Sequence, residues 1–156
     1  MRSSRLVAGA VVAVACLVAW SPAWAQTGDA GKKAEEAEKK AVDAAKAWLG
    51  LVDAGRYLES WDAAAPYFRS VVTREKWDAR LVNARTPLGY VKSRTLAMKR
   101  YTTDLEYAPK GEYVVVVFKT VFQNMPKGVK EQLETITPML QRDGAWRVSG
   151  YNIKAP

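Results

Sequence analysis

The chain has 156 residues, a formal net charge of +8, one cysteine and no histidine. The lack of histidine excludes Ser-His-Asp triads, His-Asp dyads and histidine-ligated zinc sites. With 49% hydrophobic and 26% charged residues, the composition is that of a globular protein.

Residues 1–25 have the order of features of a secretory signal peptide. Two arginines within residues 1–5 form a basic start, an uncharged apolar run covers residues 6–20, and an Ala-x-Ala motif follows at residues 23–25. The apolar run is shorter than the roughly 20 residues that a membrane-spanning helix needs. We therefore expect cleavage before Gln26, no transmembrane span, and a mature protein that is periplasmic or secreted.

Two other outcomes remain open for this segment: an uncleaved signal anchor, or cleavage that leaves a lipid-modified Cys16. The residues after Cys16 are apolar, whereas a lipoprotein signal has a polar residue there, so cleavage before Gln26 is the favoured reading. That cleavage removes Cys16 and lowers the net charge to +6. Without cysteine the mature domain has no disulfide, thiol nucleophile or cysteine-ligated metal, and its stability must come from its core.

Residues 26–33 are rich in glycine and charge and predict a disordered lead-in to a single globular domain over residues 34–156. A first helix follows, because apolar residues recur at steps of three and four and Gly55 then favours a helix stop. Its apolar stripe consists of Ala37, Ala41, Ala44, Trp48 and Val52.

Two shorter helices are expected next. One covers about residues 57–65, with Pro66 as its limit. The other begins after Thr73 as N-cap and ends before Pro87.

From Tyr90 onward the apolar residues alternate with period two, which predicts strands over about residues 91–103, 113–123, 130–140 and 145–153. The second strand is apolar on both faces, so we expect it to be central and covered on both sides or lining a cavity. Pro138 predicts an edge position or a bulge in the third strand. The order predicts an α+β fold with three N-terminal helices packed on a curved four-stranded antiparallel sheet.

Two stretches of the sequence carry a family resemblance. The first contains Ala-Trp-Leu at residues 47–49, Asp-Ala-Gly-Arg-Tyr at 53–57 and Ser-Trp-Asp at 60–62, and the second contains Asp-Gly-Ala-Trp-Arg-Val at 143–148. Over about residues 41–153 the chain resembles the bacterial secreted family called domain of unknown function 4019. It is also similar to the nuclear transport factor 2-like, or cystatin-like, fold. The resemblance implies a cone-shaped sheet around a long helix, but no particular activity, because that fold supports many functions.

The residue types leave carboxylate and tyrosine chemistry as the one route to catalysis, and no motif indicates a cofactor. Asp62 lies near Tyr57 and Tyr67 in the sequence, and Glu134 lies on a predicted strand. The favoured reading makes Asp62 a solvated helix residue and Glu134 an outward strand residue, so we assign no catalytic residue. A small isomerase or lyase that uses a carboxylate and a tyrosine inside the cone is the alternative function.

Six aromatic residues are candidates for lining a ligand pocket between helix and sheet: Trp48, Tyr57, Trp61, Tyr67, Trp146 and Tyr151. Aromatic residues at helical spacing more often fill a core, so a core role for these six residues is the alternative to a pocket.

The distribution of charge indicates what kind of partner the protein binds. Residues 69–100 contain nine basic and two acidic residues, and Arg80, Arg85 and Arg94 are our candidates for binding an anionic partner. The alternative is that these residues are only a solvated surface. The sequence therefore favours a non-enzymatic binding module for an anionic envelope component or protein. We expect no nucleic-acid partner, and a homodimer through an open sheet face is left open.

Overall fold

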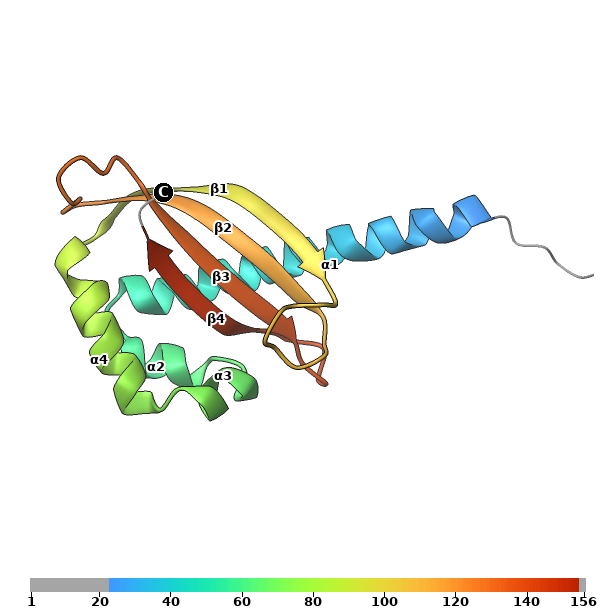
Figure 1. Ribbon diagram of the computed structural model, residues 1–156, viewed down its shortest axis with the longest axis horizontal. Coiled ribbons are helices and arrows are strands. Elements are labelled where there is room, and N and C mark those ends of the chain that lie inside the picture. The colour runs from blue at the N-terminus through green and yellow to red at the C-terminus, as the bar shows by residue number, and fades with distance from the viewer. Residues whose placement is uncertain (1–22, 155–156) are drawn as a thin grey trace, which may run out of the picture.

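The computed structural model describes residues 23–154, which form helices packed with a four-stranded antiparallel sheet (Figure 1). The helical part comprises α1 (Ala23–Asp53), α2 (Tyr57–Asp62), α3 (Pro66–Val71), α4 (Arg74–Ala84) and the short 3-10 helix η1 (Thr86–Leu88). The strands are β1 (Val91–Thr102), β2 (Tyr113–Phe122), β3 (Gln132–Leu140) and β4 (Trp146–Lys154). The expected α+β order is confirmed, and the strand bounds differ from the predicted ones by at most two residues.

The sheet is open and has the order β1-β2-β3-β4, with every neighbouring pair antiparallel. The sheet is curved, and α1 crosses behind it in Figure 1, in contact with all four strands. The shorter helices lie around the C-terminal end of α1 and beside β4. We call the face of the sheet that α1 covers the inner face and the opposite face the outer face.

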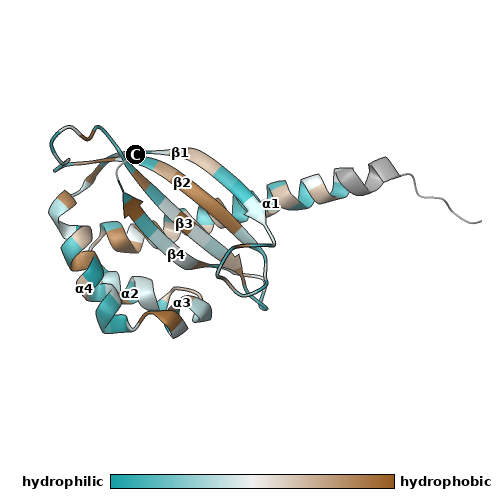
Figure 2. Ribbon diagram, viewed as in Figure 1, coloured by the Kyte–Doolittle hydropathy of each residue, from teal (hydrophilic) through white to brown (hydrophobic). Residues whose placement is uncertain are grey.

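The core lies between α1 and the inner face. Hydrophobic residues are concentrated along β2 (Figure 2), whose even-numbered side chains point inward. The expected stripe of α1 is confirmed, with Ala44 alone of its five residues only partly buried. The buried hydrophobic residues of α1 and of the inner side of β2 are Ala37, Ala41, Val42, Ala45, Trp48, Leu49, Val52, Val114, Val116, Phe118 and Phe122.

The N-terminal end of α1 differs from the expectation. The helix begins at Ala23, so residues 26–33, expected to be a disordered lead-in, are helical. The side chains of residues 28–33 are exposed, and the helix there extends the part that is anchored in the core, as helix propagation allows. Of the predicted signal peptide, residues 1–22 lie outside the described part of the chain.

The predicted helix over residues 57–65 is α2, which is shorter than expected, and a further helix that was not predicted, α3, follows it, so the described region has four α-helices rather than three. α2 ends at Asp62, and Pro66 begins α3 instead of only ending its predecessor. Proline suits the first position of a helix because its missing N–H would have no partner there. The intervening Ala65 is extended and donates its backbone N–H to the carbonyl oxygen of Val148 at 2.8 Å, which ties this turn to β4.

Three local predictions are confirmed. Thr73 caps α4, because its side chain accepts a hydrogen bond from the backbone N–H of Lys76 at 3.3 Å. The β3–β4 register shifts between Thr137 and Pro138, so the proline lies at a bulge, whose extra residue is Ser149 of β4. Gly55 ends α1 with a φ of 72°, which a residue with a Cβ adopts only at a cost.

One prediction about β2 is wrong in part. The strand is interior to the sheet, as expected, but only one of its faces is covered. The side chains of Val115, Val117 and Val121 point to the outer face and are half-buried. The reason is that the helices lie on the other side of the sheet and at its β4 edge, which leaves the outer face without a covering layer (Figure 1).

Candidate functional site

A cluster of four charged side chains joins the end of α1 to the sheet, and we call it the ion network: Asp53, Arg85, Arg94 and Glu134. Arg94 of β1 donates Nε–H to Oε2 of Glu134 at 2.8 Å and two further N–H groups to Asp53, at 2.6 and 3.0 Å. Arg85 adds a third bond to Asp53, at 3.0 Å. Two guanidinium groups thus balance two carboxylates.

Glu134 is the most buried member, with a relative exposure of 0%. Besides Arg94, Thr120 donates to its Oε2 at 2.5 Å, and Tyr151 donates its phenol O–H to its Oε1 at 2.8 Å. Our expectation that Glu134 points outward is wrong. The β2–β3 register places it opposite Phe118 on the inner face, and three donors, one of them cationic, offset the cost of burying its charge.

The surroundings shift the pKa values of Tyr151, Asp53 and Arg94. Burial, followed by the charge of Glu134, raises the pKa of the Tyr151 phenol, so this group stays a hydrogen-bond donor. Burial opposes ionisation of Asp53, but the hydrogen bonds and charges of Arg94 and Arg85 outweigh it and hold the pKa of Asp53 below its usual range. Burial likewise opposes the charge of Arg94, while Asp53 and Glu134 raise its pKa.

Arg85 and Arg94, two of our three candidates for an anionic partner, are committed to this network, so that assignment is wrong for them. Arg85 is 2% exposed, donates to the Gly89 carbonyl oxygen at 2.6 Å and lies 4.3 Å from the ring centroid of Phe122. The side chain of Arg94 is 16% exposed. A basic run in the sequence does not reveal which of its members have internal carboxylates as partners. Arg80, on α4, is exposed as expected.

Asp62 has the solvated position that the sequence favoured. Its carboxylate accepts two hydrogen bonds from Arg74, at 3.1 and 2.8 Å, and these lower its pKa. The neighbouring tyrosines are bonded elsewhere: the hydroxyl of Tyr57 lies 3.0 Å from that of Thr86, and Tyr67 donates to the Tyr107 carbonyl oxygen at 3.2 Å. The structure therefore brings no tyrosine hydroxyl to Asp62.

The aromatic candidates mostly contribute to the core. The rings of Trp48 and Tyr151 lie 5.5 Å apart, and Trp77 packs against both at 5.9 and 6.0 Å. The indole N–H of Trp48 donates to the carbonyl oxygen of Ser60 at 2.7 Å, and the indole N–H of Trp77 donates to the Ser60 hydroxyl at 2.9 Å. Tyr57 is buried, whereas Trp61, Tyr67, Trp146 and Tyr151 are partly buried.

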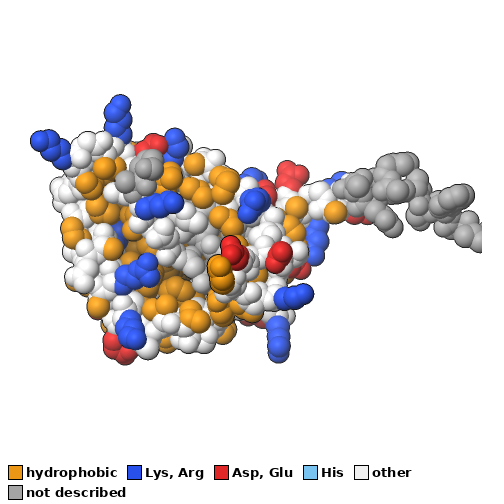
Figure 3. All heavy atoms as spheres, in the orientation of Figure 1, with side chains coloured by type: hydrophobic (Ala, Val, Ile, Leu, Met, Phe, Trp, Pro, Cys, Tyr) orange, Lys and Arg blue, Asp and Glu red, His pale blue; other side chains and the backbone are white. Residues whose placement is uncertain are grey.

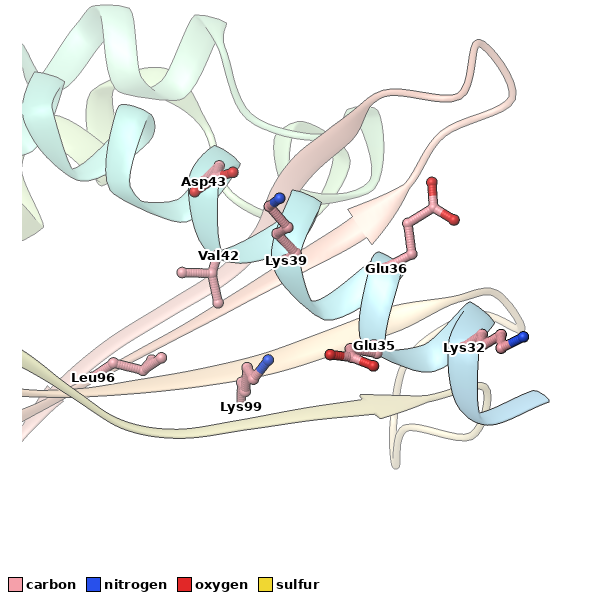
Figure 4. A pocket seen from close by; sticks show the side chains of 8 residues that line it. All are labelled: Lys32, Glu35, Glu36, Lys39, Val42, Asp43, Leu96 and Lys99. Carbon is pink, nitrogen blue, oxygen red and sulfur yellow. The ribbon is translucent and has the colours of Figure 1, made fainter. Parts of the chain in front are cut away.

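Three hollows adjoin α1. One, of about 310 Å³, lies between α1 and β4 and includes Trp48 and Trp146 in its lining. Another, of about 270 Å³, lies between α1 and the ends of β3 and β4. The third is a groove of about 500 Å³ between the middle of α1 and β1 (Figure 4). Its lining residues are Lys32, Glu35, Glu36, Lys39, Val42, Asp43, Leu96 and Lys99. Three lysines and three carboxylates make this groove neutral, so it favours neither sign of ligand charge.

The outer face of the sheet combines apolar and basic side chains. The register places on it Ser93, Thr95, Met98, Arg100 and Thr102 of β1, Tyr113, Val115, Val117, Lys119 and Val121 of β2, Leu133, Thr135, Thr137 and Met139 of β3, and Arg147, Gly150, Asn152 and Lys154 of β4. No carboxylate belongs to this set. Lys119 pairs with Glu131 at 2.8 Å and Arg147 with Asp143 at 2.7 Å, both partners lying in loops. Arg100 and Lys154 form no ion pair within residues 23–154.

Within residues 23–154 no group of three or more histidine, cysteine, aspartate or glutamate residues could hold a metal ion. None of the helices there has both the length and the hydrophobicity of a membrane-spanning segment.

Comparison with known proteins identifies the family. No curated protein matches the chain. The family described as "Protein of unknown function (DUF4019)" matches residues 44–151, which include the entire ion network. The chain therefore belongs to this family, as the resemblance of its two motifs predicts.

Proposed function

We propose that the protein is an exported, non-enzymatic binding module and that the outer face of its sheet is the binding surface. The observation that carries the proposal is that this face is uncovered although β2 presents Val115, Val117 and Val121 there. Met98, beside Val117, is 44% exposed. Apolar side chains that share an uncovered face are typical of interaction sites.

The interior supports binding outside the cone rather than catalysis within it. Glu134 and Tyr151 form the carboxylate–tyrosine pair that an isomerase or lyase would need, at 2.8 Å. The carboxylate also accepts hydrogen bonds from Thr120 and Arg94 and has no exposed surface. Five hollows on the described part of the chain include neither Glu134 nor Tyr151 in their linings. Because Glu134 has no exposed surface, a substrate would have to open the core to reach its carboxylate.

Export is part of the proposal and rests on the sequence of residues 1–25. Expression with the full N-terminus should give a mature chain that begins at Gln26, as measured by N-terminal sequencing and intact mass of the exported protein. A chain that begins at a lipid-modified Cys16, or one that keeps residues 1–25, would contradict this part of the proposal.

The binding surface can be tested without knowing the partner. We propose to compare Val117→Thr/Val121→Thr, which makes the outer face polar at nearly constant side-chain shape, with Val71→Thr/Val82→Thr. Val71 on α3 and Val82 on α4 are 60% and 46% exposed and lie off the sheet. The measurement is the fraction of purified mature domain that co-sediments with envelope material from the producing cells.

We expect the outer-face variant to lose most of this binding and the helix variant to keep it. Equal binding by both variants, or no binding by the parent domain, would contradict the proposed function. Thermal unfolding of each variant controls for folding, because Val→Thr introduces a hydroxyl group.

A further inference from the structure

The chemistry of the outer face also indicates what kind of partner it fits. We infer that the partner is an acidic protein segment, and this inference rests on the proposed function. The apolar centre of the face lies among cations that are not neutralised within the strands. A segment with carboxylates flanking aliphatic side chains would complement both features.

The strands show the charge bias directly. Four cations, Arg100, Lys119, Arg147 and Lys154, lie on the outer face, whereas the strands contain a single acidic residue, Glu134, which points inward. In the view of the outer face in Figure 3, Lys and Arg side chains lie among apolar ones over the sheet, and the visible acidic side chains lie toward its margins. The face therefore has a positive potential that favours anionic groups.

The register places the cations next to the apolar residues, with Arg100 near one end of the row of β2 valines and Lys119 between Val117 and Val121. Arg100 lies opposite Val115, and Lys119 lies opposite Leu133, which in turn lies opposite Lys154. Neighbouring strands are about 4.8 Å apart, so the backbones at Lys119 and Lys154 are separated by about 10 Å. An extended segment that crosses the strands near Leu133 would pass both lysines.

Two other occupants fit this face less well. In a two-fold dimer the same patch faces itself, which would bring Arg100, Lys119 and Lys154 of two copies together. A lipid bilayer would need large apolar groups to insert, but the outer valines are half-buried between their neighbours. The one aromatic strand residue that points to this side, Tyr113, is buried and donates to the Pro109 carbonyl oxygen.

The test uses poly-L-glutamate as the acidic polypeptide and phosphatidylglycerol vesicles as the lipid control. We propose to compare Arg100→Glu/Lys154→Glu with Lys46→Glu/Lys76→Glu, which has the same change in net charge on α1 and α4. All four residues are exposed and form no ion pair with the described part of the chain. Affinity for poly-L-glutamate should fall at least about tenfold in the outer-face variant and less than about threefold in the control.

Binding of the parent domain should also weaken as salt rises from 0.1 M to 1 M, over which the Debye length falls from about 10 to about 3 Å. The uncharged variant Arg100→Gln/Lys154→Gln should lose affinity in the same direction, which guards against misfolding of the glutamate variant. Equal losses in the two glutamate variants, or tighter binding to vesicles than to poly-L-glutamate, would overturn the inference.

Failure here is distinguishable from failure of the proposed function. If Val117→Thr/Val121→Thr still abolishes binding to envelope material while Arg100→Glu/Lys154→Glu does not, the outer face binds a partner that is not acidic. If neither variant changes that binding, the outer face is not the binding surface and both proposals fail.

Discussion

Arg94 of β1 reaches across β2 and places its Nε 2.8 Å from the buried carboxylate of Glu134 on β3. The same guanidinium group bonds to Asp53, the last residue of α1. One side chain thus joins two strands and the long helix.

Removing Glu134 should strongly destabilise the domain. Glu134→Ala leaves the largely buried Arg94 without one of its two carboxylate partners, and breaking a buried ion pair in this way costs about 3–5 kcal/mol. Tyr151→Phe deletes one hydrogen bond to the carboxylate and should cost less, about 1–3 kcal/mol. Urea unfolding of the three proteins measures both values, and an unchanged unfolding midpoint for Glu134→Ala would show that the network does not stabilise the fold.

Two nearby arginines, one on α4 and one directly after it, should respond differently to the same substitution. Arg85→Glu places a carboxylate beside Asp53 in a site that is 2% exposed, and we expect a loss of several kcal/mol or failure to fold. Arg80→Glu changes an exposed residue of α4 and should alter stability by less than about 0.5 kcal/mol. Similar melting temperatures for the two variants would contradict the assignment of Arg85 to the interior.

Trp48 should contribute more to stability than Trp146. Trp48 is 4% exposed and donates its indole N–H to Ser60, so Trp48→Ala should cost about 3–5 kcal/mol. Trp146 is only partly buried, so we expect about 1–2 kcal/mol for Trp146→Ala. Calorimetric unfolding of both variants gives the comparison, and equal losses would contradict it.

Asp53 should make the domain sensitive to acid. Its pKa is lowered in the folded protein, so its contribution is fully present above the unfolded-state pKa, near 3.8, and is lost as pH falls through the folded-state value. The free energy of unfolding should therefore decline below about pH 4, and Asp53→Asn should flatten that decline. Chemical unfolding between pH 7 and pH 2.5 measures it, with Asp43→Asn on the exposed side of α1 as the control. Parallel pH profiles for Asp53→Asn and the parent would disprove this role.

Two glycines near the end of α1 should respond in opposite ways to alanine. Gly50 lies inside the helix with open space where a Cβ would stand, so Gly50→Ala should stabilise the domain by about 0.5–1 kcal/mol. Gly55 has a φ of 72°, and Gly55→Ala should cost about 1–2 kcal/mol. Thermal unfolding tests both, and a destabilising Gly50→Ala would show that α1 does not continue regularly through residue 50.

The sequence alone determined the features that depend on local pattern. The period of three to four over residues 37–52 placed the long helix, the alternation after Tyr90 placed the strands, and Pro138 indicated the bulge. The two motifs indicated the family, which the match over residues 44–151 confirms. These features could be predicted because their physical causes act between residues close in the chain.

Only the tertiary structure decided which charged residues are internal and which face of the sheet stays uncovered. Arg85, Arg94 and Glu134 have the sequence context of surface residues, yet the β1–β2–β3 register and the end of α1 bring them together. Arg94 and Glu134 are 40 residues apart, so no local period relates them. The valines of β2 likewise predicted a strand covered on both sides, but a strand's own sequence does not specify where the helices pack. Burial is a property of the assembled layers, and the ion network and the outer face both follow from it.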